Sequence, residues 1–426
     1  MELGIIFGLF CFLLVLGTPI ALSIGLSALV GMVLTNIQPT HLITKMFGGV
    51  DSTALLAVPF FILAGEIMSR AGIIRDLVDL VDSIVGRVRG GLAYVNILAS
   101  MVFSGVSGST VADTSAIGSV LIPAMTAKGF HKDFSVSVTV AASTMGPIIP
   151  PSILMVIYAN IANVSVGRMF LGGVLPGVAI AAILSVMVFV VCRRRGYTFQ
   201  EVPPGGRDIL LRLARSQGIL CLPVLIVGGI ISGLFTATEA SVVAVVYSLL
   251  YSVLVRRSLG GRDVPDLLLR SAGTSAIVMI IMSVAAPFGD ILSRLHFQDA
   301  VVSLLYGISS RPGVLLLVIL FFMLILGCFV EATAMTIMFA GTFAAIGQQL
   351  GYDPVHFGVT MVFAMIIGSV TPPVAISLYV GLAIAQISMR EVMRMIWTFI
   401  PALIVALLLT AYMPDLVLFI PRLFFR

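Results

Sequence analysis

Apolar segments close to the length of a membrane-spanning helix recur along the whole chain. They occupy residues 5–34, 171–191, 218–235, 241–255, 314–329 and 396–412. A helix that crosses the hydrocarbon core of a bilayer needs roughly 20 predominantly apolar residues. The pattern therefore predicts an all-α polytopic membrane protein.

Between these segments the pattern predicts further elements. The sequence Gly17-Thr18-Pro19 divides the first 35 residues into two helices or kinks a single one. The other expected elements are a polar loop at 36–53, a helix at 54–70, an amphipathic helix on the membrane interface at 71–90, a mixed segment at 295–312 and a last span at 390–412.

Four apolar elements are too short, or too interrupted, to cross a bilayer as single helices. Residues 91–127 are broken by a Gly- and Ser-rich turn and predict a re-entrant hairpin, and residues 133–162 predict a helix broken at 145–151. A second hairpin is expected at 313–349, followed by a helix at 355–385 that is broken at 368–373. The chain thus contains two sets of a hairpin followed by a broken helix.

The two sets resemble each other in sequence. At a shift of about 222 residues Gly105 matches Gly327, Gly146 matches Gly368, and both broken helices contain Pro-Pro. The segment GEIMSR at 65–70 also matches GDILSR at 289–294, at a shift of about 224. We therefore predict two homologous repeats, 1–192 and 217–426, joined by a hydrophilic linker at 193–216.

Composition and charge support this interpretation and give it an orientation. The chain is 59% hydrophobic and only 10% charged, whereas an average soluble domain is about 25% charged. The net charge of +5 does not indicate nucleic-acid binding, because the basic residues gather in loops, as in cytoplasmic loops of membrane proteins. Arginines in the linker place it in the cytoplasm, and counting spans from there gives the two repeats inverted topologies. The same count places both termini outside.

Interrupted helices in inverted repeats are typical of secondary transporters, which bind substrate and ions near the membrane midplane. Unwound backbone offers carbonyl oxygens to a hard cation such as sodium, and Ser104, Ser107, Ser109, Thr110 and Thr371 add hydroxyls. Helix N-termini at the same places favour an anionic substrate group.

Several ionisable residues fall close to the interrupted elements. Glu331 lies in the second hairpin turn, and Asp113 is its approximate counterpart in the first hairpin. Glu66 with Arg70, and Asp290 with Arg294, are each spaced to pair along one helix face.

The motifs GTPIALSIGL, PFFILAGEIMSRAGI, FSGVSGSTVADTSAIGSVLIPAM, MGPIIPPS and GSVTPPVAISLYV together resemble the large membrane (M) subunit of tripartite ATP-independent periplasmic (TRAP) transporters. The resemblance covers nearly the whole chain. It implies an elevator-type carrier in the bacterial inner membrane that takes up an organic acid with two or more sodium ions. It also implies a soluble periplasmic substrate-binding protein and a small four-helix membrane subunit as a separate chain.

The resemblance also implies site residues. The first sodium site comprises Ser104, Ser107, Gly146, Ile149 and Pro151, and the second comprises Gly327, Gly368, Thr371 and Val374, with Gly105 shared. Arg294 faces the substrate carboxylate, and Glu331, Ser109, Thr110 and Asp113 complete the predicted substrate site.

Two other functions fit part of the sequence. A free-standing sodium- or proton-coupled carboxylate carrier would share the hairpins but need no binding protein. The GVSG sequence at 105–108 also matches a motif of intramembrane serine proteases, with Ser107 as the nucleophile. A serine nucleophile needs a base within hydrogen-bond reach, and none of the four histidines lies within a predicted span.

Overall fold

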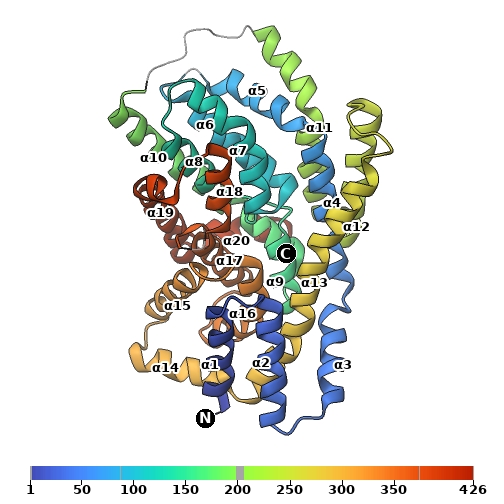
Figure 1. Cartoon of the computed structure of the whole chain (residues 1–426), viewed down its shortest axis with the longest axis vertical. Helices are drawn as coiled ribbons and strands as arrows, with labels where there is room; N and C mark the ends of the chain where they lie inside the picture. The colour runs from blue at the N-terminus through green and yellow to red at the C-terminus, as the bar shows by residue number, and fades with distance from the viewer. Residues whose placement is uncertain (1, 87, 198–205, 374, 426) are drawn as a thin grey trace.

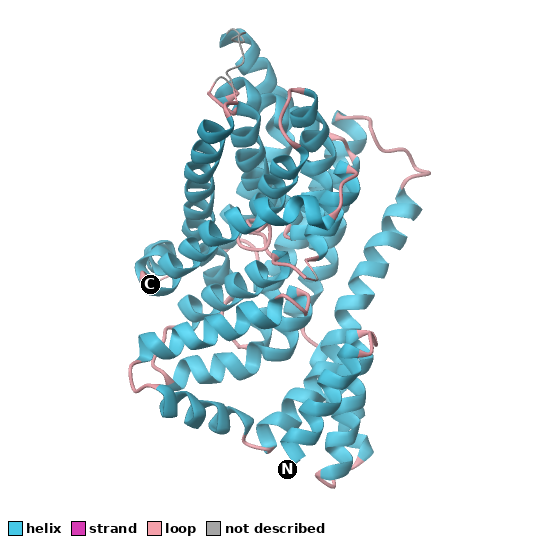
Figure 2. Cartoon of the chain, turned by 60° about the vertical axis from the view of Figure 1, so that its left-hand side comes forward, coloured by secondary structure: helices cyan, strands magenta, loops and turns pink. Residues whose placement is uncertain are grey.

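The computed structural model describes residues 2–86, 88–197, 206–373 and 375–425, and within these ranges every regular element is helical (Figures 1 and 2). Six helical segments are long and apolar enough to cross a membrane: Thr53–Arg70, Val166–Arg195, Ile209–Ile231, Ala237–Val255, Val264–Arg294 and Met389–Tyr412. The predicted all-α polytopic membrane fold is therefore confirmed.

One group of helices forms the right-hand and lower parts of the molecule in Figure 1. It comprises α1 (Glu2–Val15), α2 (Ile20–Leu34), α3 (Pro39–Val50), α4 (Ala57–Arg70), α5 (Ile73–Val85), α11 (Gly206–Ile231), α12 (Ala237–Leu250), α13 (Val264–Arg294) and α14 (Phe297–Ile308). Within it α13 packs against α2 and α3, α12 against α4, and α11 against α5.

The second group contains both hairpins and both broken helices. It comprises α6 (Gly91–Ser107), α7 (Thr110–Ala127), α8 (Lys132–Ser143), α9 (Ile153–Ile161), α10 (Val166–Arg195), α15 (Pro312–Gly327), α16 (Ala332–Gln349), α17 (Pro354–Val370), α18 (Ile376–Ala385), α19 (Met389–Tyr412) and α20 (Pro414–Phe424). The hairpin of α6 and α7 lies in the upper half of Figure 1, and that of α15 and α16 in the lower half.

The broken helices connect the two hairpins. Helix α9, the second half of the first broken helix, packs against α16 of the second hairpin and against α17. Helix α18, the second half of the second broken helix, packs against α7 of the first hairpin and against α8. Loop segments consequently lie in the middle of the molecule as well as at its ends (Figure 2). A backbone break at such a depth is tolerated where protein or a polar cavity surrounds it.

Several buried hydroxyls inside these helices form hydrogen bonds with their own helix. In α8 the hydroxyls of Ser137 and Thr139 donate to the carbonyls four residues earlier, at 2.7 and 2.8 Å, and Thr360 of α17 does the same at 2.7 Å. All three residues are fully buried. Such back-bonding lets a hydroxyl lie in an apolar interior without an unpaired donor.

Four sequence-based expectations about the elements were wrong or incomplete. The segment 36–53 is mostly helix α3 and not a loop, 295–312 contains α14, and α20 was not anticipated. Helices α10 and α11 also extend into the hydrophilic linker, to Arg195 and from Gly206, while 198–205 lie outside the described residues.

The polarity of α3 and α5 has a structural reason, because polar side chains of both helices face protein partners. In α3, His41 and Lys45 contact Asp290 of α13, at 2.9 and 2.8 Å, so their polarity does not indicate a loop. The predicted amphipathic helix is α5, and its acidic face receives Arg256, which lies 2.6 Å from Asp76. The polar residues of these short helices therefore take part in helix–helix contacts, which cannot be read from a single sequence.

Candidate functional site in a cavity between the hairpin tips

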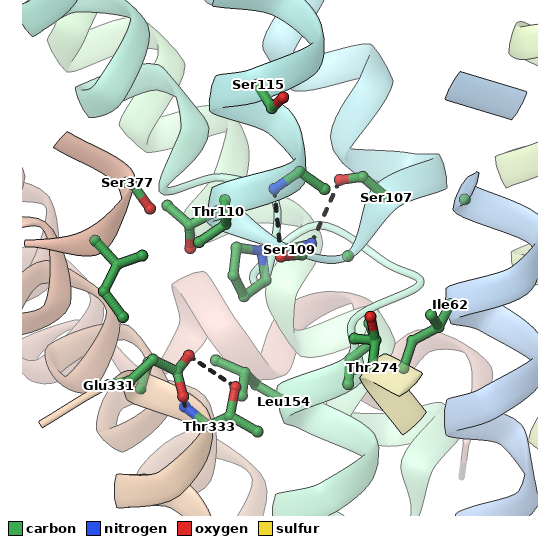
Figure 3. Close-up of a pocket in the computed structure, with 18 of the residues that line it drawn as sticks. Ile62, Ser107, Ser109, Thr110, Ser115, Leu154, Thr274, Glu331, Thr333 and Ser377 are labelled. Carbon is green, nitrogen blue, oxygen red and sulfur yellow. Dashed lines mark hydrogen bonds between the residues drawn. The ribbon is translucent and has the colours of Figure 1, made fainter. Parts of the chain in front are cut away.

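A cavity of about 670 Å³ lies between the tips of the two hairpins on one side and α4 and α13 on the other. In Figure 3, Ser109 and Thr110 of the first tip lie across from Glu331 and Thr333 of the second, and Ile62 and Thr274 belong to the opposite wall. The polar and charged lining residues are Glu66, Ser69, Arg70, Ser107, Ser109, Thr110, Ser115, Arg270, Thr274, Glu331, Thr333, Ser369 and Ser377.

The first tip is a tight turn that only glycine fits. Gly108 has φ +59°, and a Cβ there would lie 2.9 Å from the carbonyl oxygen of Pro151. Helix α7 then begins after Ser109, whose Oγ accepts a hydrogen bond from the Ala112 N–H at 3.5 Å. The turn thereby brings the α6 C-terminus and the α7 N-terminus onto the break between α8 and α9.

Behind this tip lies the fully buried carboxylate of Asp113. It accepts hydrogen bonds from Ser104 Oγ, at 3.0 Å, and from Ser107 Oγ. A Cβ on Gly146 would lie 2.8 Å from Asp113 Oδ2, so the break in the helix touches the same carboxylate. Ser104, Ser107 and Gly146, which were predicted as sodium ligands, thus lie together around Asp113.

Of the other residues predicted for the sodium sites, Gly105 and Pro151 adjoin the helix break and the turn, whereas Ile149 packs against α10. A Cβ on Gly105 would lie 3.5 Å from the Pro150 carbonyl oxygen, and Pro151 is the neighbour of Gly108. The side chain of Ile149 packs towards Gly177 of α10. Asp113 does not line the cavity, whereas Ser107, Ser109 and Thr110 do.

The second tip is organised by Glu331, the N-cap of α16. Its carboxylate accepts hydrogen bonds from the Thr333 N–H and hydroxyl, both at 2.8 Å, and from the Ala334 N–H at 3.2 Å. Ser109 occupies the N-cap position of the first hairpin, and the shift of about 222 residues also matches Ser109 with Glu331. Ser109, and not Asp113, is therefore the structural counterpart of Glu331.

The residues predicted for the second sodium site lie at the contact between α15 and α17. A Cβ on Gly368 would lie 2.5 Å from Gly327 Cα, so the two glycines meet backbone to backbone. Thr371 is 7% exposed, and its hydroxyl donates to the Ile367 carbonyl at 2.7 Å. Val374 lies outside the described residues.

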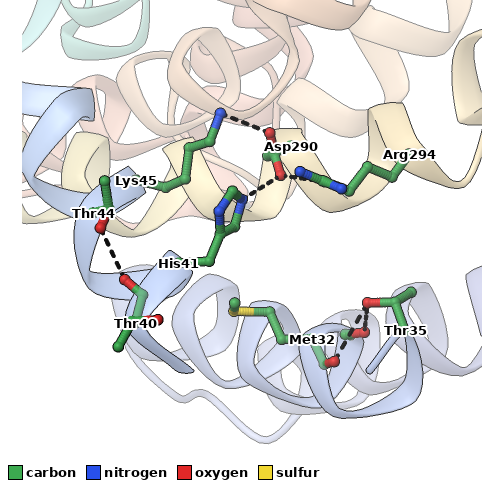
Figure 4. A network of polar contacts seen from close by, with 9 residues as sticks. Met32, Thr35, Thr40, His41, Thr44, Lys45, Asp290 and Arg294 are labelled. Atoms are coloured by element: carbon green, nitrogen blue, oxygen red, sulfur yellow. Dashed lines mark hydrogen bonds and ion pairs between the residues drawn. The ribbon is translucent and has the colours of Figure 1, made fainter. Parts of the chain in front are cut away.

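Arg294 lies away from the cavity, in a polar cluster between α3 and α13 (Figure 4). Its Nε is 2.8 Å from Asp290, whose carboxylate also contacts His41 and Lys45. The predicted pairing of Asp290 with Arg294 is therefore present, but its position beside the substrate stays a prediction. A smaller cavity of about 400 Å³ adjoins Arg294 and the N-terminal half of α3.

Two arginines line the main cavity and were missed in the sequence. They are Arg70 at the end of α4 and Arg270 near the start of α13. Arg70 does not act only along its own helix, because it reaches Asp263 at 3.2 Å and Asp266 at 3.4 Å. One signal in the sequence could have identified Arg270. It lies four residues after Asp266, just as Arg294 lies four residues after Asp290 on the same helix.

The arrangement around Ser107 is unlike a serine protease site. Its hydroxyl donates to Asp113, and the described histidines lie beside Asp290, Tyr197, Asp299 and the Thr410 carbonyl. His356, which the sequence placed in a loop-like context, is in fact buried at the start of α17. No imidazole base therefore adjoins Ser107 in the described part of the chain.

The comparisons with known proteins identify the family. The sequence profile described as "Tripartite ATP-independent periplasmic transporter, DctM component" matches residues 7–416. The chain belongs to the DctM family. It is thus a multi-pass membrane transport protein and not an enzyme, and the resemblance stated from its motifs is confirmed.

Individual relatives support the same assignment. The chain is 36% identical to the sialic acid TRAP transporter large permease protein SiaM of Vibrio cholerae, over 99% of this chain and 98% of that protein. It is 35% identical to the C4-dicarboxylate TRAP transporter large permease protein DctM of Pseudomonas aeruginosa, over 94% of each chain. It is 34% identical to the isethionate TRAP transporter permease protein DctMQ of Oleidesulfovibrio alaskensis, over 98% of this chain and 66% of that protein.

Two solved transporters share the fold of this DctM family member at low sequence identity. The YdaH transporter of Alcanivorax borkumensis superposes with a TM-score of 0.65 at 14% identity, over 90% of this chain and 88% of that chain. MtrF of Neisseria gonorrhoeae superposes with a TM-score of 0.56 at 14% identity, over 87% and 82%. These likenesses concern the fold alone.

Proposed function

We propose that this protein is the large permease of a sodium-coupled TRAP transporter that takes up an organic acid across the bacterial inner membrane. In this proposal a periplasmic binding protein delivers the acid, and a small four-helix membrane subunit completes the membrane complex. The observation that carries the proposal is the cavity at which both hairpin tips and both helix breaks meet.

Four helix N-termini at this cavity favour an anionic substrate. Thr110 of α7, Ile153 of α9, Ala332 of α16 and Ile376 of α18 are the first residues of their helices, and all four line the cavity. The N-terminus of a helix carries roughly half a positive elementary charge and free N–H groups, which favour bound anions. Hydroxyls such as those of Ser109, Thr333 and Ser377 would orient the rest of the substrate.

The buried cluster at Asp113 suits a sodium ion. Ser104 and Ser107 donate their hydroxyl protons to the carboxylate, which leaves hydroxyl lone pairs for a cation. The charge of Asp113 would offset that of the ion in this buried site. Thr371 and the carbonyls near the contact of Gly327 with Gly368 would provide a second site of oxygen ligands.

Replacing Asp113 by asparagine is expected to raise the sodium concentration for half-maximal uptake by about tenfold. The carboxamide keeps an acceptor oxygen but loses the charge, and the attraction between two opposite unit charges about 4 Å apart is about 1–4 kcal/mol in water or near a protein surface. A loss of about 1.4 kcal/mol of this attraction corresponds to a tenfold weaker affinity for sodium. Uptake at varied sodium, together with sodium-dependent thermal stabilisation in detergent, measures the shift. An unchanged sodium dependence in both measurements would remove Asp113 from the site.

An elevator movement would reconcile the cavity with the predicted role of Arg294. On α13 the cavity lining extends from Leu267 to Ile281, and Arg294 lies 13 residues further along the helix. At 1.5 Å per residue this is about 20 Å. A displacement of the hairpins by that distance along α13 would bring their tips to the Arg294 cluster.

The test of this function is uptake into proteoliposomes. The chain and its small subunit are reconstituted, an inward sodium gradient is imposed, and sialic acid, isethionate and succinate are offered with and without the cognate binding protein. We expect uptake of one of these acids only with both sodium and the binding protein. Uptake without the binding protein would instead identify a free-standing carrier, and no dependence on sodium would refute the coupling.

A further inference from the structure

Helix α13 carries the same acid–base pair near each of its ends. Asp290 and Arg294 are four residues apart and 2.8 Å from each other, and Asp266 and Arg270 are four residues apart and 3.1 Å from each other. The two arginines are separated by 24 residues, which corresponds to about 36 Å of helix. Each pair is joined by a second cation from another helix, Lys45 of α3 or Arg70 of α4.

The pair at Arg270 presents its cationic members to the cavity. Arg70 and Arg270 line it, whereas their partners Asp263 and Asp266 do not. The backbone N–H of Gly260 and then Arg70 hold the pKa of Asp263 below its usual value. The acids thus contact the guanidinium groups without lining the cavity themselves.

Arg270 retains hydrogen-bonding capacity for a ligand. It contacts Asp266 through Nε, and its side chain is 62% exposed. A guanidinium has five N–H donors in a planar fork that matches the two oxygens of a carboxylate or sulfonate. Arg70, by contrast, is divided between two carboxylates, so it would contribute mainly charge.

We infer that Arg270, supported by Arg70, forms a second anion-binding site at the arginine-rich end of the cavity, where a carboxylate or sulfonate substrate is held after it leaves the hairpin tips. This inference rests on the proposed function, and the positive-inside rule places this end in the cytoplasm. The substrate anion passes from the N-termini of α7 and α18 to Arg270 before release. Glu66, one turn before Arg70, lines the same wall, and its carboxylate would weaken the attraction of this site for an anion.

The inference predicts a defect on one side of the membrane only. In proteoliposomes, binding protein added outside supports uptake only by transporters whose periplasmic side faces outward. Uptake by the wild type is measured first, to find which of sialic acid, isethionate and succinate is carried. For Arg270→Gln, the internal concentration of that acid that half-inhibits uptake is expected to rise at least tenfold. The external concentration for half-maximal uptake is expected to stay within twofold, because the hairpin tips are unchanged.

Two matched variants complete the experiment. Arg270→Lys keeps the charge but loses the fork, so an intermediate rise of about threefold is expected. Arg262→Gln removes an exposed arginine that does not line the cavity, eight residues earlier in the chain, and is expected to leave both constants unchanged. Equal changes on both sides in Arg270→Gln, no change on either side, or the same change in Arg262→Gln would overturn the inference. If the wild type itself showed no sodium-driven uptake, the proposed function would be refuted instead.

Discussion

Replacing Gly368 by alanine is expected to destabilise the folded protein by about 3 kcal/mol or to prevent its accumulation in the membrane. The added Cβ would lie 2.5 Å from Gly327 Cα and 3.1 Å from the Leu324 carbonyl oxygen. Both atoms belong to the backbone of α15, so no side chain can rotate away. Helices α15 and α17 would therefore have to move apart. This would separate the second hairpin, α15 and α16, from the broken helix that begins with α17.

The effect is measured as the melting temperature in detergent and as the yield of monodisperse protein. Gly289→Ala is the matched control, because Gly289 lies in α13 with no atom within 4 Å of its Cβ position. Alanine is a better helix former than glycine, so the melting temperature of this control is expected to equal or exceed that of the wild type. A Gly368→Ala protein as stable as the wild type would show that the two helices do not need this contact.

The second large effect is expected from removing two hydroxyls. Ser107→Ala combined with Thr371→Ala is expected to lower sodium-driven uptake at least a hundredfold, while the protein still inserts in the membrane. Each substitution removes one oxygen from a proposed sodium site and leaves the apolar packing almost unchanged. The measurement is initial uptake under a sodium gradient, normalised to the amount of reconstituted protein.

The control for this pair removes two hydroxyls of the same kind from α7. Ser119 and Thr126 donate to the Ala116 and Ile122 carbonyls, both at 2.8 Å, in the way that Thr371 donates to Ile367. Ser119→Ala with Thr126→Ala should therefore keep the uptake rate of the wild type. Uptake at the wild-type rate in the Ser107/Thr371 variant would reject both sodium-site assignments.

Glycine- and proline-rich stretches in the sequence coincide with several helix ends in the structure. The Gly- and Ser-rich turn expected within 91–127 contains Gly108 at a positive φ, and the segment expected at 313–349 consists of α15 and α16, which together run from Pro312 to Gln349. These positions are determined by their own backbone, because glycine and proline restrict or permit particular φ values wherever they occur. The internal repeat itself stays a prediction.

Contacts between distant segments could not be obtained in the same way. The sequence paired Arg70 with Glu66 because they are four residues apart, but Arg70 reaches α13, almost 200 residues later. Similarly, the polarity of α3 depends on Asp290, which lies 249 residues from His41. Which charged side chain faces the cavity is therefore a property of the packed helices and not of local spacing.

The exchange of broken helices between the hairpins has a consequence for biosynthesis. Helix α9 ends at Ile161, but its partner α16 begins at Ala332, about 170 residues later. At 5–20 residues per second the ribosome needs roughly 10–30 s to produce that partner. During this time the face of α9 that packs against α16 lacks this partner. The first half of the chain therefore cannot complete its helix packing until the second half has been inserted into the membrane.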